Sequence, residues 1–269
     1  MRAFVNGGYL YYEESGKPSG VPVVFLHGFP FSHEMWRDQL EAVSSKGFRT
    51  LAYDLRGHGM SDVGDGQYTI ESHVDDLFSF LDLLKIPHAV IVGLSMGGYI
   101  TLRALERDAG RFLAAVLCDT RSETDSNELR VRRAAQMMQV KKDGSDAFAE
   151  GFVKAVFAAD SFIRNPDAVR KIREIIAHTP PLSIAGTLLA LAARTDTTAA
   201  LPKITVPTLI LVGEHDVTTP PTASKAMHQL VQGSELHILP GAAHMSNLEN
   251  PAAFNSHLLA FLEKVASGK

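Results

Sequence analysis

The sequence contains very little cysteine, no excess of positive charge and no long apolar run. Among 269 residues Cys118 is the one cysteine, so the chain cannot form an internal disulfide, which suits a reducing compartment. Lysine and arginine together number 26 against 30 aspartates and glutamates, for a formal net charge of -4. That balance argues against the basic surface that attracts nucleic acid or anionic lipid, and we expect neither partner.

Targeting segments and cofactor motifs are equally sparse. The opening residues MRAFVNGG reach polar turn residues too early for a secretory signal, and no segment has the apolar length needed to span a bilayer. We therefore expect a cytoplasmic protein. His33-Glu34 does not continue into a zinc motif, so we expect no metal. Gly57 and Gly59 do not complete a dinucleotide fingerprint, because residue 62 is aspartate, so we expect no cofactor.

The sequence does contain a regular alternation of strand and helix patterns. Strand patterns, most of them apolar without interruption, occur at 3–5, 9–13, 21–26, 49–53, 89–92, 114–118, 207–213 and 235–239. Helical patterns occur at 32–46, 69–84, 96–107, 220–231 and 251–266. Strands that alternate with helices predict an α/β fold with a mostly parallel, doubly wound sheet of eight strands.

Residues 121–200 follow a different pattern. This stretch has helical periodicity throughout, many alanines, a basic block at 130–133 and no convincing strand. We therefore expect a core formed by 1–120 and 201–269, with an inserted helical cap over 121–200.

The stretch around Ser95 has the pattern of a strained nucleophile. The apolar run Ala89–Val92 predicts a strand, and a helix is expected from Met96. Gly93 and Gly97 flank Ser95 at two residues on either side, where a sharp strand-to-helix turn leaves no room for side chains. Such a turn exposes the serine hydroxyl and directs the Met96 amide and the start of the helix toward the same point.

A serine needs a base and a group that orients the base. His244 follows the last strand in a Gly-Ala-Ala-His loop, and we expect it to be the base. Asp216 follows the strand at 207–213 and is the expected acid, while Asp119, at the end of the strand at 114–118, is an alternative acid. All these positions follow strand C-termini, where open parallel sheets place their sites.

These motifs, in this order, resemble the α/β-hydrolase superfamily over essentially the whole chain. The resemblance rests on His27-Gly28-Phe29-Pro30, the segment 54–59, Gly93-Leu94-Ser95-Met96-Gly97, Gly213-Glu214-His215-Asp216 and Gly241-Ala242-Ala243-His244. Within the superfamily the chain is similar to small bacterial carboxylesterases, 3-oxoadipate enol-lactonases and cofactor-free perhydrolases. The resemblance implies that the Phe29 and Met96 amides form an oxyanion hole.

Other residues near these motifs have more modest expected roles. Phe29, Phe31, Met96 and Met245 are candidates for lining the substrate pocket, with ordinary core packing as the alternative. His27 is expected to hold the oxyanion loop by hydrogen bonds. The segment 54–58 is expected to fix a turn beneath the site.

The function predicted from these residues is hydrolysis of a small carboxylic ester or lactone through a Ser95–His244–Asp216 triad and an acyl-enzyme. The sharp strand-to-helix turn at Ser95 is called the nucleophile elbow below. Serine at this elbow disfavours dehalogenases and epoxide hydrolases, which resemble this family but carry aspartate there. Two alternatives stay open. One is a ligand receptor that keeps the triad but turns over slowly, and the other is perhydrolysis or C–C bond hydrolysis by the same triad. The sequence leaves the oligomeric state open.

Overall fold

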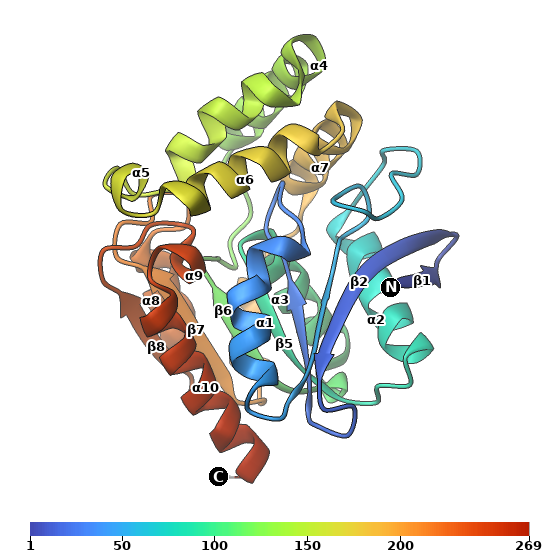
Figure 1. Ribbon diagram of the computed structural model, residues 1–269, viewed down its shortest axis with the longest axis vertical. Helices are drawn as coiled ribbons and strands as arrows, with labels where there is room; N and C mark the ends of the chain where they lie inside the picture. The colour runs from blue at the N-terminus through green and yellow to red at the C-terminus, as the bar shows by residue number, and fades with distance from the viewer. Residues whose placement is uncertain (269) are drawn as a thin grey trace.

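Eight strands form one sheet in the computed structural model, which describes residues 1–268 (Figure 1). The spatial order is β1-β2-β4-β3-β5-β6-β7-β8. β2 pairs antiparallel with β1 and β4, and the remaining pairs are parallel. The bounds are β1 Arg2–Val5, β2 Gly8–Gly16, β3 Pro22–Leu26, β4 Arg49–Tyr53, β5 Ala89–Leu94, β6 Phe112–Cys118, β7 Thr208–Gly213 and β8 Glu235–Leu239. The predicted fold class is confirmed.

Helices cover both faces of the sheet, as expected for uninterrupted apolar strands. α1 (Arg37–Ser44) and α10 (Pro251–Ser267) contact each other on the near face in Figure 1, while α2 (Ile70–Leu83) and α3 (Met96–Asp108) pack together on the far face. α8 (Pro221–Leu230) packs against β7 and β8. Short turns of helix occur at η1 (His33–Trp36), η2 (Ala109–Arg111), η3 (Thr198–Lys203) and α9 (Ser246–Glu249).

The starts of α1 and α2 show how local chemistry sets helix boundaries. Thr69 caps α2: its Oγ1 accepts from the Ser72 amide at 2.9 Å, and the Thr69 amide donates to Ser72 Oγ at 3.0 Å. The expected helix 32–46 instead begins as the 3₁₀ turn η1. Its first amide, that of His33, donates to Asp54 Oδ1 at 2.7 Å, and the Ser32 side chain makes no capping hydrogen bond.

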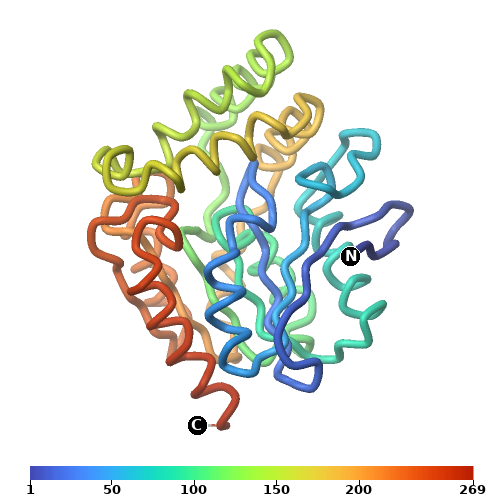
Figure 2. The backbone as a smooth tube through the Cα atoms, viewed as in Figure 1, coloured from blue at the N-terminus to red at the C-terminus, as the bar shows by residue number. Residues whose placement is uncertain are grey.

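Residues between β6 and β7 form a separate layer of helices. Figure 2 follows the chain as it leaves the sheet after β6, runs through these helices and returns to the sheet at β7. The helices are α4 (Asn127–Val156), α5 (Ser161–Arg164), α6 (Pro166–His178) and α7 (Pro181–Ala193), called here the helical layer. They lie across the edge where the parallel strands end (Figure 1). No strand is present from 121 to 200.

One pair of helices in this layer is apolar enough to be compared with a membrane span. Within residues 1–268, no single helix is both long and apolar enough to cross a bilayer. α6 and α7 meet that criterion only when counted together, across a bend of 98°.

Candidate active site

Ser95 sits in a strained turn between β5 and α3. Its φ of 54° and ψ of -111° lie outside the conformations that side-chain-bearing residues prefer. The neighbouring strand holds this backbone in place: the Ser95 amide donates to the Cys118 carbonyl at 2.9 Å, and Thr120 Oγ1 donates to the Ser95 carbonyl at 2.8 Å. The elbow predicted from the glycine spacing is therefore present as a backbone feature.

The glycines around Ser95 are sterically required. A Cβ atom on Gly93 would lie 2.3 Å from the Gly97 carbonyl oxygen, and one on Gly97 would lie 2.2 Å from the Leu26 carbonyl oxygen. Both obstacles are backbone atoms, which cannot swing aside as a side chain can. The close approach of β3, β5 and α3 thus depends on glycine at these positions.

Asp216 and His244 are joined by a direct hydrogen bond. His244 Nδ1 lies 2.8 Å from Asp216 Oδ2, and both side chains are buried. Asp216 also accepts from Thr219 Oγ1 at 2.7 Å and from the amides of Thr218 and Thr219 at 2.8 and 3.0 Å. Burial raises the pKa of Asp216, but the facing His244 and these hydrogen bonds outweigh it, so the pKa is lowered overall. Asp216 is therefore held as a carboxylate.

Asp119, the alternative acid, has different partners. Its Oδ1 accepts from the Gly213 amide at 2.8 Å, and Ser246 Oγ donates to its Oδ2 at 2.5 Å. Complete burial, together with the negative charge of Asp216, raises the pKa of Asp119 well above its ordinary value. The geometry favours Asp216 as the partner of His244, because the imidazole nitrogen bonds to Asp216.

Ser95 and His244 both line a cavity of about 410 Å³ beneath the helical layer. That volume lies within the range of small-molecule sites, roughly 300–1,000 Å³. Its remaining lining comes from the sheet edge and the helical layer: Phe29, Met96, Tyr99, Arg121, Leu129, Arg132, Arg133, Gln136, Gln139, Ala147, Phe148, Gly151, Phe152, Ala155, Val156, Leu191, Val217 and Thr218.

Two of the four expected pocket residues occupy other places. Phe29 and Met96 line the cavity, whereas Phe31 and Met245 are not among its lining residues within 1–268. Phe31 is fully buried with its ring edge-on to Phe152 at 6.1 Å, so it supports the wall from behind. Met245 is also fully buried in the core. For both residues the structure corrects the expectation in favour of core packing.

His27 holds the loop that carries Phe29. Its Nδ1 donates to the Gly28 carbonyl at 2.8 Å, and its Nε2 accepts from the Leu55 amide at 2.9 Å. Burial lowers the pKa of His27 to about 4, so the ring is neutral near pH 7 and this single tautomer satisfies both bonds. The loop is thereby tied to the turn that follows β4.

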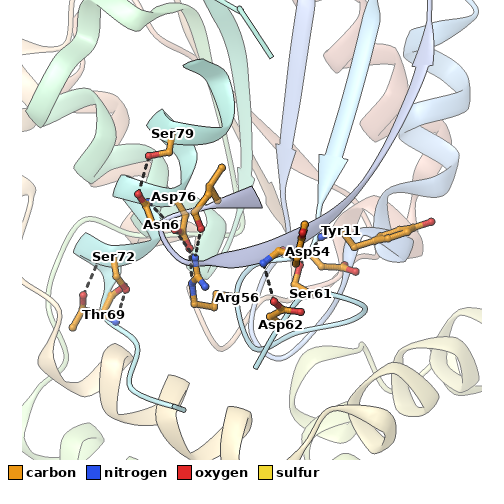
Figure 3. Close-up of polar contacts among 12 residues, drawn as sticks. Asn6, Tyr11, Asp54, Arg56, Ser61, Asp62, Thr69, Ser72, Asp76 and Ser79 are labelled. Carbon is orange, nitrogen blue, oxygen red and sulfur yellow. Dashed lines mark hydrogen bonds and ion pairs between the residues drawn. The ribbon is translucent and has the colours of Figure 1, made fainter. Parts of the chain in front are cut away.

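The turn after β4 is itself fixed by charged side chains (Figure 3). Arg56 donates from Nε and Nη2 to the two carboxylate oxygens of Asp76 on α2, at 3.0 and 2.9 Å. Asp54 Oδ2 accepts from the Met60 amide at 2.8 Å, and Ser61 Oγ donates to the Asp54 carbonyl at 2.6 Å. These residues have the supporting position predicted for the segment 54–58.

Glu249, which the sequence reasoning missed, connects the helical layer to the loop of His244. Its Oε1 accepts from the Ala158 amide at 2.7 Å and from Ser161 Oγ at 2.6 Å, next to α5. Its Oε2 accepts from the amide of Ala243, the residue before His244, at 2.8 Å. No local signal identifies this role, because its partners lie as far as 91 residues away.

The threonines that hold Asp216 were also missed, although the sequence carries a signal for them. An aspartate that accepts from amides two and three residues later forms a turn of its own, and hydroxyl residues commonly follow in such turns. Asp216-Val217-Thr218-Thr219 has that pattern. The part of the chain that the structure describes contains no group of three or more histidine, cysteine, aspartate or glutamate side chains suited to a metal ion.

Comparison with known proteins places this geometry in a family. The model of the alpha/beta hydrolase family matches residues 23–257. A thermophilic esterase from Thermogutta terrifontis, solved with malate bound, superposes with a TM-score of 0.94 at 33% identity over 99% of both chains. The enol-lactonase from Burkholderia xenovorans superposes with a TM-score of 0.91 at 34% identity, over 98% of this chain and all of its own.

The curated relatives lead to the same assignment. A non-heme chloroperoxidase from Kitasatospora aureofaciens is 32% identical over 96% of this chain and 98% of its own length. The family model covers most of the sheet and the whole helical layer, including the elbow at Ser95 and the loop of His244. The chain belongs to the alpha/beta hydrolase family.

Proposed function

We propose that this protein is a serine hydrolase that cleaves a small carboxylic ester or lactone through an acyl-enzyme. The observation that carries the proposal is the Asp216–His244 hydrogen bond beside a cavity that Ser95 also lines. Because Asp216 engages Nδ1 of His244, Nε2 is left for proton transfer. The helical layer would then act as a cap over this site, spanning about 121–200.

The proposed reaction has two halves. His244 removes the Ser95 hydroxyl proton as the oxygen attacks the carbonyl carbon, and the amides of Phe29 and Met96 stabilise the resulting oxyanion. His244 then gives the proton to the leaving alkoxide, which departs as an alcohol. A water molecule, deprotonated by His244, attacks the acyl-enzyme and releases the carboxylic acid. The first amides of α3 have no acceptor within the helix, which makes them suitable oxyanion donors.

The similar proteins support this choice of chemistry. An esterase and an enol-lactonase share the fold with this chain at 33 and 34% identity, and both names describe cleavage of an ester bond. Perhydrolysis is a second candidate, favoured by the 32% identity to a non-heme chloroperoxidase. Adding hydrogen peroxide to an acetate-containing assay separates the two, because a perhydrolase would form peracetic acid faster than it hydrolyses an acetyl ester.

Replacement of the serine tests the proposal. Ser95→Ala should abolish hydrolysis of 4-nitrophenyl butyrate while the circular dichroism spectrum and melting temperature stay close to those of the parent. Ser79→Ala, on α2 and outside the cavity lining, removes only a hydrogen bond to Asn6, so it serves as the matched control and should keep full activity. Undiminished turnover in Ser95→Ala would refute the proposed mechanism.

A further inference from the structure

The cavity beside Ser95 is lined by positive charge. Arg121, Arg132 and Arg133 contribute to its walls, and Gln136 and Gln139 add amide groups. No aspartate or glutamate of residues 1–268 is among the lining residues. A neutral ester gains little from such a wall, whereas an anion is attracted to it.

The arginines are gathered by a single buried carboxylate. Asp125 is paired with Arg133, with Arg121 at 2.8 Å and with Arg194 at 3.1 Å. One negative charge thus faces three positive charges. The next carboxylates along the chain, Glu123 and Asp196, do not line the cavity. Asp196 adds a second negative charge near Arg194, whereas Arg121 and Arg133, which line the cavity, share the single carboxylate of Asp125.

Two of the arginines in this cluster also have buried nitrogen atoms without hydrogen-bond partners. The Nε atoms of Arg121 and Arg194 are buried and have no acceptor among residues 1–268. Burial lowers the pKa of Arg194; Tyr99 and Asp125 oppose this shift, and Arg121 and Arg133 add to it. Arg194 does not line the cavity itself, but it stacks at 4.2 Å on the ring of Tyr99, which does.

The order of the strands places this charge on one side of Ser95. β5, which carries Ser95, lies between β3 and β6. Phe29 follows β3, and its ring packs edge-on against Phe148 and Phe152 of α4, so the β3 side of the cavity is apolar. Arg121 follows β6, so the opposite side is cationic. A ligand that reaches across Ser95 meets both surfaces.

We propose that the cavity selects an ester or lactone that carries a carboxylate, which binds to Arg121, Arg132 and Arg133 while the scissile carbonyl lies at Ser95. The inference rests on the proposed hydrolase function and adds its substrate class. Guanidinium groups pair with carboxylates through two parallel hydrogen bonds, which makes arginine well suited to such recognition. The apolar aromatic side would accommodate the uncharged part of the substrate.

Matched esters with and without a charge test the proposal. On the acyl side the pair is mono(4-nitrophenyl) glutarate and 4-nitrophenyl butyrate; on the alcohol side it is the butyryl ester of 3-hydroxybenzoate and phenyl butyrate. For at least one pair, we expect kcat/KM of the parent to be about tenfold higher for the charged ester than for its neutral counterpart. A tenfold preference is what one hydrogen bond to a charged group typically contributes. Rising salt should reduce this preference through screening.

Arginine variants then locate the subsite. Arg132→Gln removes an exposed guanidinium that has no carboxylate partner among residues 1–268, so it should fold normally and lower the preference for the charged ester. Arg133→Gln and Arg121→Gln should lower the ratio of kcat/KM for the charged ester to that for the neutral ester further, because each removes a guanidinium from the cavity wall. Arg130→Gln is the matched control: Arg130 lies on the same helix, donates to Thr124 Oγ1 at 3.0 Å and does not line the cavity. It should leave the preference unchanged.

A binding measurement separates this inference from the proposed function. Glutarate at millimolar concentration should raise the melting temperature of the parent and of Arg130→Gln by more than that of Arg132→Gln, which leaves Asp125 with all three of its arginines, even if no ester is cleaved. Hydrolysis of neutral esters with no preference for either charged ester, together with no shift by glutarate, would overturn the carboxylate subsite while leaving the hydrolase proposal intact. Loss of all ester cleavage with the glutarate shift preserved would overturn the hydrolase proposal alone.

Discussion

The sheet edge around Ser95 and the helical layer above it are held by different kinds of contact. At the sheet edge the backbone itself is packed tightly, and a single added carbon on Gly93 or Gly97 would meet another backbone atom. In the helical layer the side of the cavity is formed by arginines that extend from helices and loops, and Gly151, also in the cavity wall, has open space around it. Under the proposed function, the rigid sheet edge would carry the reacting groups and the helical layer would select the substrate.

The largest expected effect concerns the two buried aspartates of the sheet edge. Asp216→Asn should lower kcat by about 10⁴-fold, because an amide cannot hold the required tautomer and charge of His244. Asp119→Asn should lower it less than tenfold, since Asp119 bonds to the Gly213 amide and to Ser246 and does not contact the His244 ring. Steady-state kinetics on one ester measures both. The reverse ranking would move the orienting role to Asp119.

Two glycines test the contrast in packing directly. Gly93→Ala should lower the free energy of unfolding by about 3 kcal/mol, because its Cβ would press on the Gly97 carbonyl oxygen. Gly151→Ala in α4 should raise it by about 0.5 to 1 kcal/mol, because alanine restricts the unfolded chain and meets no neighbour within 4 Å. Urea denaturation of both variants provides the measurement. Equal destabilisation by the two would remove the proposed difference between the regions.

Glu249 connects the two regions, and its replacement measures how much they depend on each other. Glu249→Gln keeps the shape but leaves a buried donor without its acceptor, so we expect a loss of about 1 to 3 kcal/mol in unfolding free energy. We also expect kcat to fall more than KM rises, since Ala243 precedes His244. Ser161→Ala removes one contact on the side of the layer and should have little effect on kcat. A normal kcat in Glu249→Gln would show that the His244 loop does not need this link.

A dependence of stability on pH is expected from His73 of α2, which is buried against the sheet side of the molecule and not in the helical layer. Burial lowers the pKa of His73 from 6.5 to about 4, and neither ring nitrogen has a partner among residues 1–268. The unfolded chain therefore takes up the proton first, so the stability of the folded state is complete above pH 6.5 and falls as the pH drops toward 4. His73→Phe should remove this loss, which is about 2 kcal/mol at pH 5. Urea midpoints at pH 5 and pH 8 test it, and an unchanged difference between them would contradict the assignment.

The parts of the fold that sequence reasoning anticipated are those with local causes. Most of the parallel strands were identified by uninterrupted apolar runs, and the helical pattern over 69–84 located α2 to within one residue at each end. The helix expected from Ser32 was wrong in its first turn, where the His33 amide donates to Asp54, distant in the chain, and the Ser32 side chain makes no capping hydrogen bond. The pocket roles of Phe31 and Met245 were wrong for a similar reason: adjacency to a motif does not say on which side of the chain a side chain packs.

By itself the sequence determined the sheet, the strained turn at Ser95 and the sheet edge at which the candidate residues meet, because periodicity, glycine spacing and the rule for parallel strands act over short stretches of chain. Only the tertiary structure decided that His244 bonds to Asp216 and not to Asp119, that Glu249 joins the helical layer to the His244 loop, and that Asp125 gathers arginines from three separate segments. The contacts of His244 with Asp216, of Glu249 with Ala158 and of Asp125 with Arg194 join residues far apart in the chain, so local patterns carry no signal for them.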